Sequence, residues 1–298
     1  MPRVDLAEAA RLLRAGALVG VPTETVYGLA ADALDPAAVA AIFTAKGRPA
    51  NHPLIVHTLD DPDTHAFADD RARALAATFW PGPLTLVLPK RAHVPDAVTG
   101  GHPTVAVRSP AHPVARELLR LADRPFAAPS ANRFGQLSPT TAEHVLASFP
   151  DLPVLDGGRC EVGVESTIVD LTGPATLLRP GGVPADAVAA VIGPLVHGGH
   201  TPAPGNLAAH YAPRAVLVAT DDPEGEAARH RAAGRTVAVL RALPATAYAH
   251  ALYDALRALD ARGADVIVAE WAASGGLGDA VNDRLRRAAA AGGTFGTS

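Results

Sequence analysis

Apolar residues recur along the chain at two characteristic spacings. In seven segments they fall three to four residues apart, which predicts helices at 6–15, 35–46, 70–79, 113–122, 140–149, 247–261 and 279–290. Short apolar runs bounded by Gly, Pro or polar residues predict strands at 17–21, 54–57, 84–88, 104–108, 126–128, 165–170, 176–179, 215–219, 236–240 and 265–269. The two kinds of segment alternate without a strict βαβ order. We therefore expect an α/β fold with a mixed, twisted sheet.

One stretch interrupts this alternation. Residues 192–213 are rich in Pro and Gly and show no apolar period, which is typical of a linker. The alternation resumes after it, with strands that suit a parallel sheet. A chain of 298 residues is long for one hydrophobic core. We therefore expect a large α/β domain followed by a small one.

Composition narrows the class of protein. Hydrophobic residues make up 48% and aromatic residues 4%, so the core must be mainly aliphatic. Cys160 is the lone cysteine, which excludes an intrachain disulfide and a multi-cysteine zinc site and suits a reduced, cytoplasmic protein. No apolar run reaches the length of a membrane span, and the N-terminus does not resemble a signal peptide. A net charge of −4 argues against a general nucleic-acid surface, so any anion must be bound by a local cluster of cations.

The first polar cluster is Pro22-Thr23-Glu24-Thr25-Val26-Tyr27-Gly28-Leu29, directly after a predicted buried strand. Small hydroxyl residues at a strand end can contact a ligand, and Gly28 permits close approach of the backbone. A helix that starts with Thr23 or Thr25 as its N-cap is the alternative interpretation, and the residues alone leave both open.

The second cluster surrounds Gly47, where Lys46 and Arg48 flank a predicted helix end. Lys46 and Lys90 are the only lysines among 26 basic residues, which makes Lys46 a candidate for a specific role. A lysine beside an arginine suits phosphates and carboxylates. The alternative is that both cations merely compensate the helix dipole.

Further polar side chains stand at other predicted strand ends. Arg108 and Arg179 each end a strand, Pro129-Ser130-Ala131-Asn132 follows one, and Glu165-Ser166-Thr167 begins another. Charged arginines next to apolar strands need anionic partners. We expect three arginines, Arg48, Arg108 and Arg179, and one lysine, Lys46, to converge on one polyanion. Known P-loop, dinucleotide-binding, zinc-protease and nucleophile-elbow motifs are absent from the sequence.

These motifs occur in a specific order: P-T-E-T-V-Y-G-L, K-G-R-P, P-L-I-V-H, W-P-G-P-L-T-L-V-L, V-A-V-R, P-S-A-N, S-P-T, E-S-T-I-V-D and R-P-G. From about residue 6 to 193 the chain resembles the threonylcarbamoyl-AMP synthase family with its YrdC-like domain. The segment P-G followed by H-Y-A-P, and the later G-L-G-D-A-V-N-D-R-L, are similar to the family's long form. The resemblance implies a YrdC-like twisted mixed sheet with an open cleft at 1–193, a lid-forming linker at 194–213 and a small Rossmann-like α/β domain at 214–298.

The resemblance also implies the reaction. The family condenses L-threonine, bicarbonate and ATP to threonylcarbamoyl-adenylate and pyrophosphate. A separate complex then transfers the threonylcarbamoyl group to an adenosine of transfer RNA. Mg²⁺ is expected with ATP, while a resident metal, a membrane and a stable nucleic-acid complex are not.

Carried over by motif, the implied site residues form three groups. Threonine would be bound by Thr25, His57, Arg108 and Ser166, with Arg108 pairing the carboxylate. ATP would be bound by Arg48, His52, Thr104, Ser130, Asn132, Ser138, Arg179 and Tyr211, the last reaching over the cleft from the linker. Lys46 and Arg48 would act on the phosphates or the carbamate during catalysis.

Two features depart from the family pattern: His52 stands where Asn is usual, and the linker lacks the basic residues often found before His210-Tyr211. A carbamoyl transferase and a non-catalytic RNA-binding module are the alternative functions. The first is disfavoured because one cysteine cannot build the zinc fingers of known carbamoyl-transferring relatives. The second is disfavoured by the negative net charge and the few aromatic residues.

Overall fold

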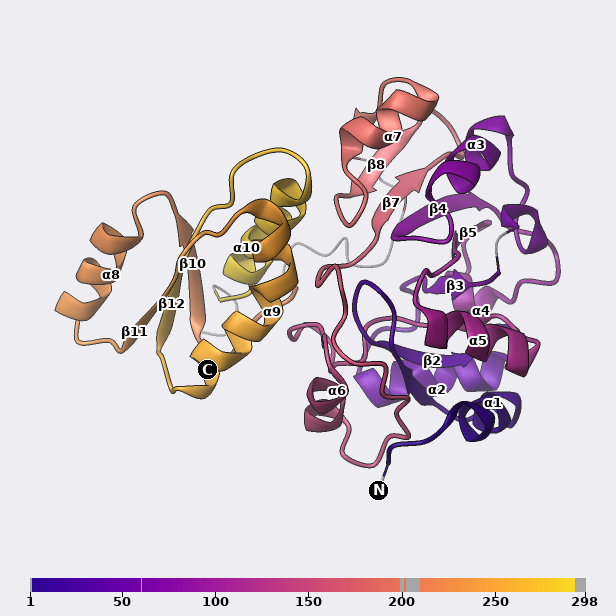
Figure 1. The fold of residues 1–298 in the computed structure, drawn as a ribbon, viewed down its shortest axis with the longest axis horizontal. Helices are drawn as coiled ribbons and strands as arrows, with labels where there is room; N and C mark the ends of the chain where they lie inside the picture. Colours follow the sequence, from indigo (N-terminus) through magenta and orange to yellow (C-terminus); the bar gives the residue numbers. More distant parts are fainter. Residues whose placement is uncertain (1, 60, 199–200, 202–209, 293–298) are drawn as a thin grey trace.

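A computed structural model describes residues 2–59, 61–198, 201 and 210–292 of the chain (Figure 1). The helices are α1 (Leu6–Arg14), α2 (Pro36–Lys46), α3 (Asp70–Phe79), α4 (Asp96–Thr99), α5 (Pro113–Ala122), α6 (Ala142–Ser148), α7 (Ala185–Ile192), α8 (Pro223–Ala232), α9 (Ala245–Ala261) and α10 (Leu277–Gly292), with a 3₁₀ turn η1 (Pro62–Thr64). The strands are β1 (Val19–Val21), β2 (Gly28–Asp32), β3 (Ile55–His57), β4 (Leu84–Pro89), β5 (Thr104–Arg108), β6 (Phe126–Ala127), β7 (Thr167–Asp170), β8 (Thr176–Arg179), β9 (Val196–His197), β10 (Val216–Thr220), β11 (Val237–Leu240) and β12 (Val266–Glu270).

The large sheet has the strand order β1-β2-β6-β3-β5-β4-β7-β8-β9 within the described part of the chain. β3 pairs with β5 and β4 with β7 in parallel, whereas β4 and β5 pair antiparallel. The presence of both parallel and antiparallel pairs confirms the expected mixed sheet. Because the order is not sequential, segments far apart in the sequence end side by side.

Both faces of the large sheet are covered, as the alternation of side chains along β2 shows. Leu29 and Ala31 point into the hydrophobic core shared with α2, while Ala30 lies in the core shared with α1 and α5. Successive residues of a strand face opposite sides, so a strand buried on both sides must be apolar throughout. The Gly-Leu-Ala-Ala sequence of β2 meets that condition.

The small sheet has the order β10-β12-β11, and both outer strands run parallel to β12. Helices α9 and α10 cover the face that lies toward the large domain, and α8 covers the other face (Figure 1). The expected small α/β domain with a parallel sheet is confirmed.

Six elements were not predicted from the sequence: β2, β9, α4, α7, α8 and the turn η1. β2 was missed because its alanines lack the branched or aromatic side chains that favour strands. α8 was missed because it carries no apolar stripe; Asp222 caps it by accepting a hydrogen bond from the amide of Gly225 at 3.0 Å. α7 lies in a stretch to which no helix was assigned.

The predicted domain boundaries stay predictions. Strand β9 pairs with β8 of the large sheet, a few residues beyond the expected boundary at 193. Half of the linker, residues 199–200 and 202–209, lies outside the described residues. Among the helices that the structure describes, none combines the length and apolar character needed to cross a membrane.

Candidate active site

Polar residues at the ends of several strands line one cavity. Its interior measures about 50 Å³. It is lined by Thr23, Thr25, Val26, Gly28, Lys46, Arg48, Ile55, His57, Arg108, Ala128, Pro129, Ser130, Glu165, Ser166, Arg179, His210 and Tyr211. The expected convergence of three arginines and one lysine is therefore found.

Strand pairing explains why these residues meet. β3 and β5 are parallel neighbours, and His57 stands directly beside Arg108 in their register. Gly28 pairs with Ser130 on the opposite side of the cavity. A Cβ atom on Gly28 would lie 2.9 Å from the Cβ of Ala128, so only glycine permits this approach of the two backbones.

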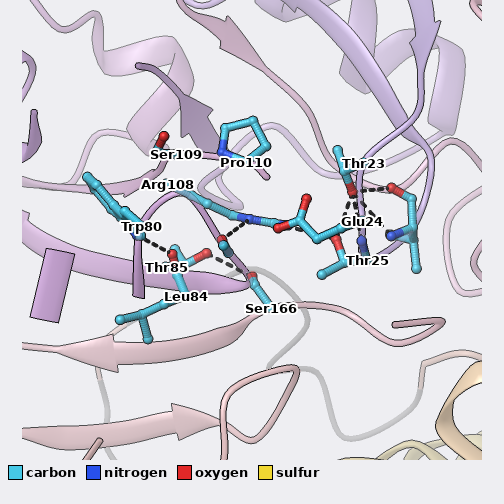
Figure 2. Close-up of polar contacts among 12 residues, drawn as sticks. Thr23, Glu24, Thr25, Trp80, Leu84, Thr85, Arg108, Ser109, Pro110 and Ser166 are labelled. Atoms are coloured by element: carbon cyan, nitrogen blue, oxygen red, sulfur yellow. Dashed lines mark hydrogen bonds and ion pairs between the residues drawn. The ribbon is translucent and has the colours of Figure 1, made fainter. Parts of the chain in front are cut away.

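Arg108 is held by three hydrogen bonds (Figure 2). Its Nη2 donates to Oε1 of Glu24 at 2.6 Å, its Nη1 to Oγ1 of Thr25 at 2.9 Å, and its Nε to the carbonyl of Gly82 at 3.2 Å. Arg108 is 3% exposed and Glu24 is 4% exposed. Two buried, opposite charges with matched hydrogen bonds fix the guanidinium in one orientation. Two of its five N–H groups are left for other acceptors.

The Thr23–Thr25 segment is a turn that leads into β2. Oγ1 of Thr23 accepts from the amides of Thr25 and Val26, both at 3.2 Å, and donates to the carbonyl of Val26 at 2.6 Å. Threonine hydroxyls commonly stabilise such turns. The alternative of a helix capped by these threonines is wrong.

Lys46 is buried at the end of α2, and its side chain spans to the loop that follows β6. Its Nζ donates to the carbonyls of Ser130 and Asn132, the latter at 2.6 Å. Burial, and next the nearby Arg48, lower the pKa of Lys46 well below its usual value. The ammonium thus bridges two segments of the cavity wall, which the helix-dipole alternative does not explain.

Arg48 stands just beyond the αL residue Gly47, whose φ of 65° ends the helix. Its Nη2 donates to the carbonyl of Pro53 at 3.0 Å. Burial lowers the pKa of Arg48 to about 10; Tyr211 opposes that shift and Arg179 adds to it. The guanidinium stays charged at neutral pH and presents a cation to the cavity.

The β7–β8 side of the cavity is a second hydrogen-bond network. Oγ of Ser166 lies 2.8 Å from Oγ1 of Thr85, as Figure 2 shows, and accepts from Nη2 of Arg179 at 3.1 Å. Arg179 also donates from Nε to the carbonyl of Ser166. The neighbouring Glu165 accepts from Oγ of Ser138 at 2.5 Å.

His57 is a neutral histidine in this site. Burial, and next the adjacent Arg108, lower its pKa to about 3. Its ring stacks on Phe126 at a centroid distance of 5.1 Å, and its Nδ1 lies 3.2 Å from the carbonyl of Ile55. The neutral imidazole of His57 therefore adds no positive charge beside that of Arg108.

The linker residues His210 and Tyr211 complete the wall. Tyr211 is 2% exposed and adopts φ of 61°, a conformation that tyrosine rarely takes. Burial raises the pKa of Tyr211, so its hydroxyl stays protonated. The described end of the linker, His210 and Tyr211, therefore lies in the same cavity wall as the lysine and the three arginines.

Four of the predicted site residues do not line the cavity. Ser138 reaches it through Glu165, and Asn132 contributes its carbonyl to Lys46 while its side-chain amide donates to the backbone of 133 and 136. The His52 ring faces Phe134 at 5.9 Å. Thr104 begins the strand that Arg108 ends, which separates the two by roughly 13 Å. The roles of these four residues stay predictions.

Sequence reasoning missed Glu24 and Glu165 as site residues. Both stand within the recognised motifs, but each is defined by an ionic partner that is distant in the sequence. Only the fold brings Glu24 to Arg108 and Glu165 to Arg284.

The side chains that could act as metal ligands show whether the cavity is suited to bind a metal ion. No group of three or more His, Cys, Asp or Glu side chains with metal-binding geometry occurs among the described residues. Glu165 is the one carboxylate in the described cavity wall, and its oxygens already accept hydrogen bonds. The wall therefore offers cations to an anionic ligand, and a Mg²⁺ ion would fit here only as part of that ligand.

Comparison with known proteins agrees with this geometry. The family model described as Telomere recombination matches residues 11–181, and the one described as Threonylcarbamoyl-AMP synthase, C-terminal domain, matches residues 183–290. The threonylcarbamoyl-AMP synthase of Pyrococcus abyssi is 45% identical over 94% of this chain and 92% of its own length. That of Bacillus subtilis is 41% identical over 96% of this chain and 93% of its own length.

A solved structure of P. abyssi Sua5 complexed with L-threonine is similar over 97% of this chain and 96% of that one. Its TM-score is 0.91 and its sequence identity 42%. The match therefore extends over both domains. The chain belongs to the threonylcarbamoyl-AMP synthase family.

Proposed function

We propose that this protein condenses L-threonine, bicarbonate and ATP to threonylcarbamoyl-AMP and pyrophosphate. The observation that carries the proposal is the convergence of Lys46, Arg48, Arg108 and Arg179 on one cavity in a chain of net charge −4. Four cations at one site call for a polyanionic ligand. Relatives that cover nearly the whole chain are named threonylcarbamoyl-AMP synthase, and one is solved with L-threonine.

Threonine belongs at the Arg108 end of the cavity. Arg108 keeps N–H groups for a carboxylate, since Glu24, Thr25 and Gly82 use only part of its donors. The hydroxyls of Thr25 and Ser166 and the neutral ring of His57 are the nearby polar groups for the rest of the amino acid.

We place ATP beside Lys46, which holds the Ser130 loop, and beside Arg48, with Arg179, which contacts Ser166, as a further cation of the same wall. Lys46 and Arg48 would neutralise the phosphates during reaction, and Mg²⁺ would enter with the nucleotide. His52, Thr104, Asn132, Ser138 and Tyr211 complete the proposed nucleotide contacts.

The chemistry needs positioning more than covalent catalysis. The threonine amine and bicarbonate form a carbamate with loss of water. A carbamate oxygen then attacks the α-phosphorus of ATP, a P–O bond forms, and pyrophosphate leaves with the electrons of the bond that breaks. Fixed cations that stabilise the charge on the transferring phosphoryl group account for acceleration of such a step.

We propose that substrate entry requires movement of His210 and Tyr211. An interior of about 50 Å³ is far below the roughly 300 Å³ or more of ordinary ligand pockets. His210 and Tyr211 occupy the wall on the side of the second domain. We propose that they withdraw to admit ATP and close again over the intermediate, which excludes water from a hydrolysable anhydride.

The product fits a role in transfer RNA modification. A mixed anhydride is an activated acyl donor, and a separate complex would transfer its threonylcarbamoyl group to an adenosine. We place the enzyme in the cytoplasm, where that acceptor is made and used.

Labelled bicarbonate tests the proposal. With ATP and L-threonine present, the ¹⁴C label should appear in a nucleotide that also contains threonine. Label without a threonine requirement would favour a carbamoyl transferase. Binding of RNA with no nucleotide product would favour a non-catalytic RNA-binding module.

A further inference from the structure

Arg284 on α10 of the small domain is buried against the cavity of the large domain. It is 1% exposed. Its Nε donates to Oε2 of Glu165 at 2.7 Å, and its Nη1 donates to the carbonyl of Pro180 at 3.0 Å. Its guanidinium carbon lies 5.2 Å from the ring centroid of Tyr211. One side chain thus contacts three segments of the cavity wall that are distant from one another in the sequence.

Each residue that Arg284 contacts is adjacent in the sequence to a residue proposed to bind substrate, or is itself such a residue. Glu165 precedes Ser166, Pro180 follows Arg179, and Tyr211 itself lines the cavity. Glu165 also accepts a hydrogen bond from Ser138. A displacement of Arg284 would therefore be transmitted to the groups that face ATP.

We propose that Arg284 is a positioning residue for the nucleotide site, through which the small domain controls the charge and placement of Glu165. This proposal deepens the function proposed above and rests on it. It gives the small domain a defined part in the reaction of the large one.

The electrostatic reason lies in the location of Glu165. Its carboxylate is buried in the wall of a cavity that must accept phosphates, where an unpaired anion would repel ATP. Burial alone would raise the pKa of Glu165, but Arg284 first and then Arg179 reverse this and lower it to about 2. The carboxylate is therefore ionised at neutral pH, and Arg284 supplies the nearest compensating charge.

The hydrogen bonds of Glu165 support the same conclusion. Its two oxygens accept from Ser138, from the hydroxyl of Tyr253 on α9 at 2.9 and 3.1 Å, and from Arg284. Two of these three partners belong to the small domain. Removal of one member of a buried ion pair leaves the other charge uncompensated, which is costly in a low-dielectric site.

The test measures ligand binding separately from turnover. In the full-length protein, Arg284→Met should raise the Kd for Mg·ATP about 10- to 100-fold, measured by calorimetry. The Kd for L-threonine, which is zwitterionic and held at the Arg108 end, should change much less. Arg286→Met is the matched control, because Arg286 lies on the exposed face of the same helix against Trp271.

A double variant separates positioning from folding. Glu165→Gln removes the buried anion, so Arg284→Met added to it should weaken ATP binding much less than it does alone. Arg284→Lys, which keeps the charge, should lie between the wild type and Arg284→Met. Near-ultraviolet circular dichroism checks that each variant is folded.

Two results would overturn the proposal. A folded Arg284→Met protein with wild-type affinity for ATP would show that Arg284 is structural only. Equal losses in the presence and absence of the Glu165 charge would exclude the electrostatic link. Failure of the proposed function is recognised separately, because the wild-type protein would then not bind threonine or would form no threonine-containing nucleotide from labelled bicarbonate.

Discussion

At the scale of residues, the buried Lys46 carries a large electrostatic cost. Its ammonium is removed from water and stands near Arg48, and both effects favour the neutral amine. Its hydrogen bonds to two backbone carbonyls only partly offset this cost. A protein retains such a group where its charge is used, which under the proposed function is on the phosphates of ATP.

Lys46→Met should therefore reduce pyrophosphate release by about 100-fold or more, because a fixed cation is lost beside the transferring phosphoryl group. The free energy of unfolding should change by less than about 2 kcal/mol, since the lost hydrogen bonds are offset by removal of a buried charge. Steady-state release assays and urea unfolding measure the two quantities.

Lys90→Met is the matched control for this variant. Lys90 forms a surface ion pair with Asp96 and does not line the cavity. Its replacement should leave turnover unchanged. Wild-type turnover in Lys46→Met would contradict the assignment of Lys46.

The residue types of the site could largely be predicted from the sequence, whereas their pairings could not. Lys46 stands out as one of only two lysines, and Arg108 and Arg179 stand out because charges next to buried strands need partners. The carboxylates Glu24 and Glu165 become apparent as site residues only in the fold, which brings Glu24 to Arg108 and Glu165 to Arg284 of α10.

At the scale of elements, the end of α2 sets the geometry of the phosphate-facing cations. Gly47 adopts φ of 65° and separates Lys46 in the last helical turn from Arg48 outside the helix. The left-handed conformation costs other L-residues about 1–2 kcal/mol. A Cβ atom at this position would meet nothing within 4 Å, so the backbone conformation alone decides the outcome.

Gly47→Ala should lower the free energy of unfolding by about 1 kcal/mol and raise the KM for ATP about tenfold, because relief of the strain shifts Lys46 against Arg48. Gly47→Asn tolerates the left-handed conformation better and should recover much of both losses. Gly263→Ala tests the specificity of the effect: Gly263 has φ of 76° and open surroundings but lies far from the cavity. It should lose stability without a change in KM, and an equal KM for all three variants would refute the argument.

The elements with strong apolar periodicity were predicted well, and the exceptions have physical reasons. The strands that end in His57 and Arg108 have branched apolar residues and were expected. β2 is rich in alanine and was not, although it forms part of the same sheet. α8 depends on its Asp222 cap and on packing against the small sheet rather than on an apolar stripe.

At the scale of the whole molecule, the buried ionisable groups make folding sensitive to acid. Burial lowers the pKa values of His57 and His210 from 6.5 to about 3. Between these values the unfolded chain binds protons that the folded protein does not, so stability falls as the pH falls. The effect begins before that of Glu165, whose pKa is lowered from 4.5 to about 2 and which loses its contribution only below 4.5.

Each of the two histidines should therefore reduce the free energy of unfolding by about 1.4 kcal/mol for each pH unit below 6.5. Urea unfolding between pH 6.5 and 4.5 measures the slope. His57→Gln should remove the share of His57 from that slope. An unchanged slope would show that His57 is protonated in the folded state.

The contact between the domains is the feature that the sequence leaves undetermined. Two domains could be inferred from the linker composition, but the burial of Arg284 against Glu165 depends on how α10 meets the large domain. Tyr253 on α9 and Tyr211 from the linker join the same buried cluster. The small domain is therefore continuous with the wall of the site.

The most direct test of the central claim is pyrophosphate release from ATP with and without L-threonine and bicarbonate. The account predicts release only when both co-substrates are present, because the carbamate is the nucleophile that displaces pyrophosphate. Folded protein that releases pyrophosphate without threonine, or releases none when all three substrates are present, would contradict it.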